Sequence, residues 1–258
     1  MKHLFVLFAY LFVLFTGINL HAQHNSEEEI NKAKALAMQA YMSYDKDVLL
    51  NARNIFEKLY NSDKTSLLPL YYMTLLDYKY LEMNLKGDGT LFDKYYDNAV
   101  SNAEILSNDK SFMADGKTLL AGIYMMKIAV SAMSAVTLSP KIHSLLDDVQ
   151  AQKPSKPYSY IIRGMMKFNT PGIFGGSYDD ALKNFNQAIK LSENQENDPL
   201  TPGWAYVEAL AWKGRTLVEL ENYDAAVFTY KKALAEEPEY GWVKHVLLPQ
   251  VDKEISNR

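Results

Sequence analysis

Cysteine is absent from the sequence of 258 residues. Its absence excludes disulfide bonds, thiolate metal sites, a cysteine nucleophile and the lipidated cysteine of a bacterial lipoprotein. Positive charge is also in deficit, because 27 Lys and Arg stand against 31 Asp and Glu. A nucleic acid is therefore an unfavourable partner, since phosphate binding needs concentrated positive charge.

Long hydrophobic runs are missing except near the start of the chain. An apolar block of 12 residues, Leu4 to Phe15, follows Lys2 and leads to Leu20-His21-Ala22, a cleavage site of the A-x-A kind. The block is too short for a membrane span, which needs roughly 20 residues. The sequence therefore predicts a signal peptide over residues 1–22 and a soluble exported protein, periplasmic or secreted and not a lipoprotein. Without Lys2 the net charge is −5.

The rest of the chain reads as amphipathic helices separated by short polar or Pro/Gly breaks, with no strand-like alternation. Short connections make neighbouring helices pack antiparallel. We expect one helical domain over residues 23–258. The predicted helix starts are a capping box at Ser26, then Asp47, Ser66, Thr90, about residue 111, Pro140, Pro157, Asp179, Pro202 and Tyr223. The third helix is expected to end at Gly87-Asp88-Gly89, and the fifth to run over residues 111–136.

Residues 207–238 carry a repeat pattern. Small residues and aromatic residues recur at tetratricopeptide spacing, namely Leu210, Gly214, Leu217, Tyr223, Ala226, Tyr230, Ala233 and Pro238. A second copy over residues 157–192 has Tyr160, Gly164, Tyr178, Ala181, Phe185 and Ala188 in the same roles. Five extra residues lie in its turn, because 17 residues rather than 12 separate its two small residues. The fold class predicted is an all-α solenoid of about ten to twelve helices in antiparallel hairpins, with a polar C-terminal cap over residues 239–258.

The chain thus resembles the tetratricopeptide-repeat family. Three further features, Leu138-Ser139-Pro140-Lys141, the turn at 169–176 and the segment Asp198 to Trp204, resemble uncharacterised exported repeat proteins of Bacteroidetes. The Pro171-x-x-Phe174-Gly175-Gly176 turn also looks like that of the periplasmic T component of tripartite (TRAP) transporters, a helical-repeat protein. Members of that family are typically lipoproteins, and this chain has no cysteine to carry a lipid.

Catalytic and metal motifs fail on inspection. Asp115-Gly116-Lys117-Thr118 resembles the end of a P-loop but has Ser111 where the first glycine is required. A calcium loop from Asn61 would need Gly and Glu where Ser66 and Tyr72 stand. The histidines beyond residue 22, His24, His143 and His245, form no zinc-ligand pair, and the Asp147-Asp148 and Asp179-Asp180 neighbours point about 100° apart on a helix. We expect no enzyme activity, no cofactor and no metal.

Tyrosine is abundant, with 18 in the chain and a concentration in the first half at Tyr71, Tyr72, Tyr78, Tyr80, Tyr95 and Tyr96. These rings either fill the interfaces between helices or line a ligand groove. The resemblance implies that the first helix of each repeat faces the concave surface. It thereby assigns Tyr158, Ile161, Met165 and Phe168 in one copy and Glu208, Ala211, Arg215 and Val218 in the other, with Phe174 at a pocket edge. The Lys and Asn of a carboxylate clamp are not among them.

Two functions remain open. The first is a scaffold of the cell envelope that holds a protein or peptide in its concave face. The second is a small-molecule-binding accessory of an envelope transporter. A scaffold should expose a continuous apolar groove, whereas a carrier should enclose a pocket of roughly 300 to 1,000 Å³.

Overall fold

The computed structural model describes residues 27–86, 89–193 and 198–257, and regular structure there is entirely helical. The elements, in chain order, are a first helix over residues 27–43, α2 (Lys46–Ser62), α3 (Leu67–Met83), α4 (Gly89–Ser107), α5 (Met113–Val130), the 3₁₀ turn η1 (Ala132–Ser134), α6 (Ala135–Gln152), α7 (Pro157–Asn169), the 3₁₀ turn η2 (Gly172–Phe174), α8 (Tyr178–Glu193), α9 (Ala205–Glu219), α10 (Tyr223–Glu236), the π-helical η3 (Val243–Leu247) and α11 (Leu248–Ser256). The prediction of an all-α array of hairpins is confirmed. The signal-peptide pattern and Ser26 lie outside the described residues.

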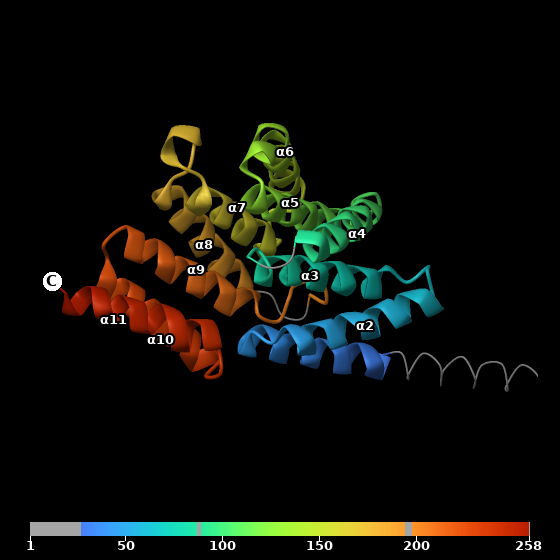
Figure 1. Ribbon diagram of the computed structural model, residues 1–258, viewed down its shortest axis with the longest axis horizontal. Helices are drawn as coiled ribbons and strands as arrows, with labels where there is room; N and C mark the ends of the chain where they lie inside the picture. Colours follow the sequence, from blue (N-terminus) through green and yellow to red (C-terminus); the bar gives the residue numbers. More distant parts are fainter. Residues whose placement is uncertain (1–26, 87–88, 194–197, 258) are drawn as a thin grey trace, which may run out of the picture.

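The helices form two layers that bend into an arch (Figure 1). From α2 to α6 and from α7 to α10, each helix packs against the next in sequence, and α3 also contacts α5, α5 contacts α7, and α7 contacts α9. The odd-numbered helices from α3 to α9 therefore make the inner layer. α3 buries fourteen of its seventeen residues, whereas the outer helix α8 buries four of sixteen.

The two ends of the arch touch each other. The hydroxyls of Tyr41 in the first helix and Tyr240 before η3 are hydrogen-bonded at 3.0 Å. The Tyr41 ring also stacks on Trp204, with ring centres 4.8 Å apart. In Figure 1 the blue helices at the start of the described chain accordingly lie next to the red segment near α10 and α11. The array is thus closed by specific contacts between its first helix and its last repeat.

The predicted repeats correspond to two hairpins, α7–α8 and α9–α10. Gly214 of α9 lies against the ring of Tyr230, and Gly164 of α7 lies against the ring of Phe185. A Cβ at either glycine would overlap the opposing ring. Glycine is therefore required where the two helices of each hairpin approach most closely.

The expanded turn of the first hairpin contains η2. Gly175 has a φ of +89°, which favours glycine, and a Cβ on Gly176 would overlap the carbonyl of Thr170. The Lys167 ammonium donates to the carbonyl oxygen of Gly175 at 2.9 Å, which fixes the loop to α7. The turn consequently leaves Ile173 and Phe174 largely exposed, at 88% and 73%.

The predicted start at Pro140 is wrong. α5 ends at Val130, and α6 begins at Ala135, so that Pro140 lies inside α6 rather than at its first turn. Proline lacks the N–H that would bond to the carbonyl of Val136. Val136 is 75% exposed, so water can satisfy that carbonyl, and the helix tolerates the proline.

Other boundaries shift by smaller amounts. α3 ends at Met83, before the predicted glycines, and α9 begins at Ala205 rather than at Pro202. α2 begins at Lys46 because the Asp45 carboxylate accepts hydrogen bonds from the amides of Asp47 and Val48. The predicted starts at Pro157 and Tyr223 are those observed.

Most of the six clustered tyrosines fill helix interfaces. Tyr71, Tyr72, Tyr78 and Tyr80 are buried within α3. The hydroxyl of Tyr72 donates to the carbonyl of Pro199 at 2.6 Å, and that of Tyr71 donates to the carbonyl of Leu200. These tyrosines thus attach the loop before α9 to the first half of the array.

Candidate binding cleft

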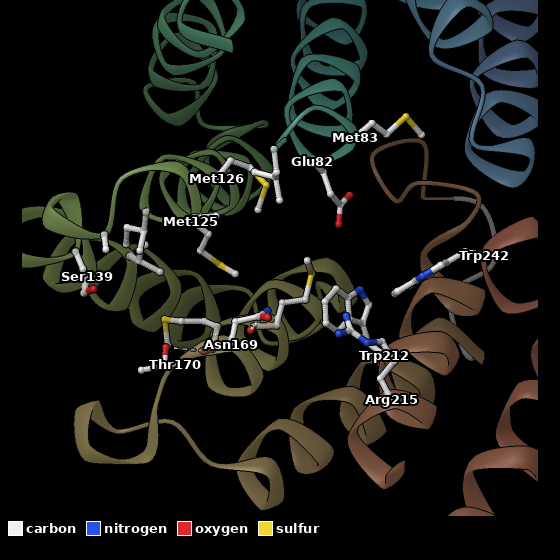
Figure 2. Close-up of a pocket in the computed structure, with 18 of the residues that line it drawn as sticks. Glu82, Met83, Met125, Met126, Ser139, Asn169, Thr170, Trp212, Arg215 and Trp242 are labelled. Carbon is white, nitrogen blue, oxygen red and sulfur yellow. Dashed lines mark hydrogen bonds between the residues drawn. The ribbon is translucent and has the colours of Figure 1, made fainter. Parts of the chain in front are cut away.

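A cleft of about 1340 Å³ lies on the inner side of the arch (Figure 2). It is formed where the C-terminal ends of α3, α5 and α7 meet the middle of α9, with α6, η2, the end of the first helix and the segment 240–246 around its edge. Its lining is mostly apolar side chains. The cleft is therefore a product of several repeats and of the closing contact between the ends.

Methionine is concentrated here, since five of the eleven methionines in the chain line the cleft. They are Met83, Met125, Met126, Met165 and Met166. Each belongs to the last turns of an inner helix or lies near its end. Unbranched, polarisable side chains of this kind can adapt to different apolar surfaces.

Aromatic rings form the opposite wall, as Figure 2 shows for Trp212 and Trp242. Their ring centres are 5.6 Å apart in an edge-to-face arrangement. Arg215 lies one turn after Trp212 on α9, and its guanidinium carbon is 4.4 Å from the ring centre of Trp212 and 5.6 Å from that of Trp242. The ring of Phe168, at 4.8 Å, completes an aromatic enclosure of the cation.

A buried ionic cluster lies behind the cleft. Lys79 is fully buried, and its ammonium donates to Glu208 at 2.5 Å and to Glu82 at 2.9 Å. Burial lowers the pKa of Lys79, but the two carboxylates more than offset this, so its pKa is raised above the ordinary value. Burial also raises the pKa of Glu208. Of the cluster, Glu82 lines the cleft, and Figure 2 shows its carboxylate pointing inward.

Two further ring contacts join this cluster to the closing contact. The Lys79 ammonium lies 5.0 Å from the ring centre of Tyr41 and 5.9 Å from that of Tyr158. Because Tyr41 and Tyr240 both line the cleft, the ionic cluster, the closing contact and the cleft share residues. A bound molecule would therefore contact the same side chains that hold the ends of the arch together.

The predicted site residues divide into two groups. Met165, Phe174 and Arg215 line the cleft. Tyr158 and Ile161 are buried, and Glu208 is also buried, where it forms an ion pair with Lys79. Phe168 does not line the cleft but stacks behind Arg215.

Several lining residues were not predicted, among them Glu82, Trp212 and Trp242. One sequence signal could have indicated part of the site, because the two Met-Met pairs, Met125-Met126 and Met165-Met166, both lie there. Trp242 follows the last repeat, beyond the region in which repeat positions predict a face.

Two histidines, His143 and His245, also line the cleft. Burial and the nearby Arg163 and Lys167 lower the pKa of His143. Over the described ranges 27–86, 89–193 and 198–257, no group of three or more His, Asp or Glu side chains is placed to hold a metal ion. Within the same ranges no helix has the length and apolar character of a membrane span.

Comparisons with known proteins agree with the repeat pattern. The family model for a tetratricopeptide repeat matches residues 207–240. A comparison with curated protein sequences found no match.

Two solved structures share the architecture. A thermophilic tetratricopeptide-repeat protein of Thermus thermophilus is 17% identical, with a TM-score of 0.59 over 86% of this chain and 98% of that chain. The HusA haemophore of Porphyromonas gingivalis is also 17% identical, with a TM-score of 0.60 over 75% of this chain and 93% of that chain. The chain therefore carries a tetratricopeptide repeat at residues 207–240 and has the fold of tetratricopeptide-repeat proteins.

Proposed function

We propose that this chain is a non-catalytic interaction module that holds an apolar helical segment of a partner protein in its cleft. The observation that carries the proposal is the cleft itself, which is open, mostly apolar and lined by five methionines. Grooves of this kind bind the apolar face of an amphipathic helix. Tetratricopeptide-type arrays present such surfaces on their concave side.

The size of the cleft favours a polypeptide over a small molecule. A volume of about 1340 Å³ exceeds the roughly 300 to 1,000 Å³ of small-molecule pockets. A helix about 10 Å across rises 1.5 Å per residue and so occupies about 120 Å³ per residue. About eleven residues, or three turns, would therefore fit in the cleft.

We place this interaction in the cell envelope. The support is the sequence pattern of residues 1–22, in which Lys2 precedes an apolar block and a small-residue cleavage site. The protein would then act in the periplasm or outside the cell. Its partner would be an envelope or secreted protein.

The experiment uses a matched pair of substitutions at equally exposed phenylalanines. Phe174 lines the cleft and is 73% exposed, whereas Phe228 on α10 is 72% exposed and lies outside it. A photo-crosslinking residue at position 136 in the full-length protein first identifies the partner in its own organism. The purified partner is then titrated against both variants.

We expect Phe174→Glu to weaken binding at least tenfold, because it places a charge beside the apolar helix, and Phe228→Glu to leave the affinity unchanged. Equal affinities for the two variants would contradict the proposal. Because both side chains are largely exposed, neither change should unfold the protein.

A second candidate is a carrier of a flat apolar small molecule, such as an accessory of an envelope transporter would be. The observation that favours it is the pair of tryptophan rings in the cleft, together with the similar fold of a haemophore. Mass spectrometry of the organic extract of protein purified from its own organism tests it. A stoichiometric small molecule that is lost in Phe174→Glu and kept in Phe228→Glu would favour the carrier over the helix-binding module.

A further inference from the structure

Among the described residues, Arg215 is a charged residue of the cleft lining that has no carboxylate in direct contact. The lining contains one carboxylate residue, Glu82, and one guanidinium residue, Arg215. Glu82 is paired with Lys79 at 2.9 Å. Arg215, in contrast, makes neither a hydrogen bond nor an ion pair with any residue in the ranges 27–86, 89–193 and 198–257.

The other described arginines show what is missing. Arg53 is paired with Asp77 and Glu57, both at 2.7 Å, and Arg163 with Asp147 at 2.6 Å. Each of these cations thus has a carboxylate in hydrogen-bonding contact. Water does not fully replace such a partner at Arg215, because this side chain is half-buried and enclosed by aromatic rings. A cation held in an apolar site without an acceptor is unfavourable unless something else supplies one.

Three aromatic rings restrict where that acceptor can lie. Trp212, Phe168 and Trp242 lie within 4.4 to 5.6 Å of the guanidinium carbon. Rings contact the flat faces of a guanidinium, whereas its N–H groups point outward in its plane. Carboxylates bind to that edge with two parallel hydrogen bonds. Because the three rings surround the guanidinium and Arg215 lines the cleft, a carboxylate can approach it from the cleft.

We propose that Arg215 binds a carboxylate on the partner helix, so that the module selects an apolar helix with an Asp or Glu at the border of its apolar face. This inference rests on the proposed function. The methionines would contact the apolar positions, and Arg215 would set the register of the helix along the cleft. Charge complementarity supports an acidic residue there, since within the described residues no carboxylate lies in hydrogen-bonding contact with the guanidinium.

Two synthetic peptides of sixteen residues with blocked ends test this. Both carry Leu and Met at i, i+3, i+4 and i+7 and a polar face of Gln and Ser, and they differ only in a Glu or a Gln at the centre. The full-length protein is titrated at pH 7 while the fluorescence of the tryptophans is followed, because Trp212 and Trp242 line the cleft. We expect the Glu peptide to bind about tenfold more tightly than the Gln peptide.

Three variants attribute the preference to one side chain. Arg215→Met keeps the volume but removes the charge, and we expect it to abolish the preference for Glu. Arg215→Lys keeps the charge without the planar fork and should retain part of it. Arg163→Met removes a cation outside the cleft lining and should leave the preference intact.

The outcomes separate the two proposals. Equal binding of the Glu and Gln peptides, or a preference that survives in Arg215→Met, overturns the role of Arg215 and leaves the helix-binding function standing. If neither peptide binds, the proposed function is overturned, and so is the proposed binding of a peptide carboxylate by Arg215. In that case hexadecanoate and hexadecanol are compared, and selection of the acid by the wild type but not by Arg215→Met would reassign Arg215 to a small apolar acid.

Discussion

At the scale of single residues, Lys79 is a buried cation that the folded structure neutralises with two carboxylates. It is fully buried, it pairs with Glu82 one turn later on α3, and its ion pair with Glu208 joins α3 to α9 across the array. Removing one partner of a buried ion pair leaves an uncompensated charge. We expect Lys79→Met to lower the free energy of unfolding by about 3 to 5 kcal/mol, measured by urea denaturation.

Two further measurements serve as comparisons for the stability of Lys79→Met. Glu208→Gln in the Lys79→Met background should restore part of the loss, because the stranded charge is gone. The exposed pair of Lys183 and Asp180, at 3.1 Å, offers the surface control. Lys183→Ala should change stability by less than about 0.5 kcal/mol. A loss below about 1 kcal/mol for Lys79→Met would show that the pair is not structural.

The buried carboxyl of Asp115 should make the free energy of unfolding decrease as the pH rises. Burial raises the pKa of this carboxyl to about 6, against the effect of Lys156 at 2.9 Å. Because its folded pKa exceeds the unfolded value of about 3.9, the native state holds the proton more tightly. The resulting contribution is present below about pH 4 and is lost as the pH rises through about 6.

We therefore compare the wild type with Asp115→Asn in urea at several pH values. Relative to the variant, the free energy of unfolding of the wild type should fall by about 1 to 3 kcal/mol between pH 4 and pH 7. Parallel pH profiles for the two proteins would show that Asp115 ionises at its usual pKa.

The repeat pattern predicted which helices form the inner layer. It was less accurate for which of their side chains line the cleft. The pattern assigned Glu208 and Arg215 to the same face of α9. Glu208 is instead buried, because Lys79 of α3 reaches it from a repeat distant in sequence. A single repeat does not specify what covers it, so Arg215 lines the cleft while Glu208 does not. Whether the predicted residues bind anything stays a prediction.

At the scale of elements, the α9–α10 hairpin depends on Gly214. A Cβ at this position would overlap the buried ring of Tyr230. We expect Gly214→Ala to cost about 1 to 3 kcal/mol of stability, measured by thermal and urea denaturation, because a packed ring cannot move aside freely. The gain in helix propensity from alanine would offset part of that cost.

The control is Gly172→Ala at the start of η2, where a Cβ would meet no atom within 4 Å. It should change stability by less than about 0.5 kcal/mol. If both alanine variants are equally stable, the hairpin does not require the close approach at Gly214.

Helix starts could be predicted where the local chain decides them. Pro157 opens α7, and Tyr223 follows Asn222, whose side chain accepts from the amide of Ala225. Pro140 could not be placed in this way, since the start of α6 depends on the turn η1 that precedes it. The cleft was harder still, because α3, α5, α7 and α9 meet only in the assembled array.

At the scale of the molecule, the contact between Tyr41 and Tyr240 should make unfolding cooperative. All three tryptophans, Trp204, Trp212 and Trp242, lie in the second half of the chain, so fluorescence reports that half, whereas far-ultraviolet circular dichroism reports every helix. Open arrays can unfold in parts. For this closed array we expect both signals to change at the same urea concentration.

Tyr41→Ala removes the hydrogen bond to Tyr240 and the stacking on Trp204. We expect the two transitions to separate in this variant, with the fluorescence and dichroism midpoints no longer equal. Tyr60→Ala on α2, which lies away from the closing contact, should leave them coincident. Coincident transitions in Tyr41→Ala would show that closure does not set the cooperativity.

Closure also limits how such a protein can diversify. An open array lengthens by duplicating a repeat, since a new hairpin only has to stack on its neighbour. Here an added hairpin would separate the first helix from Tyr240 and break the contact between them. The number of hairpins, and with it the span of the cleft, is therefore constrained. New specificities have to arise by exchange of lining side chains, for which methionines on α5 and α7 provide tolerant starting points.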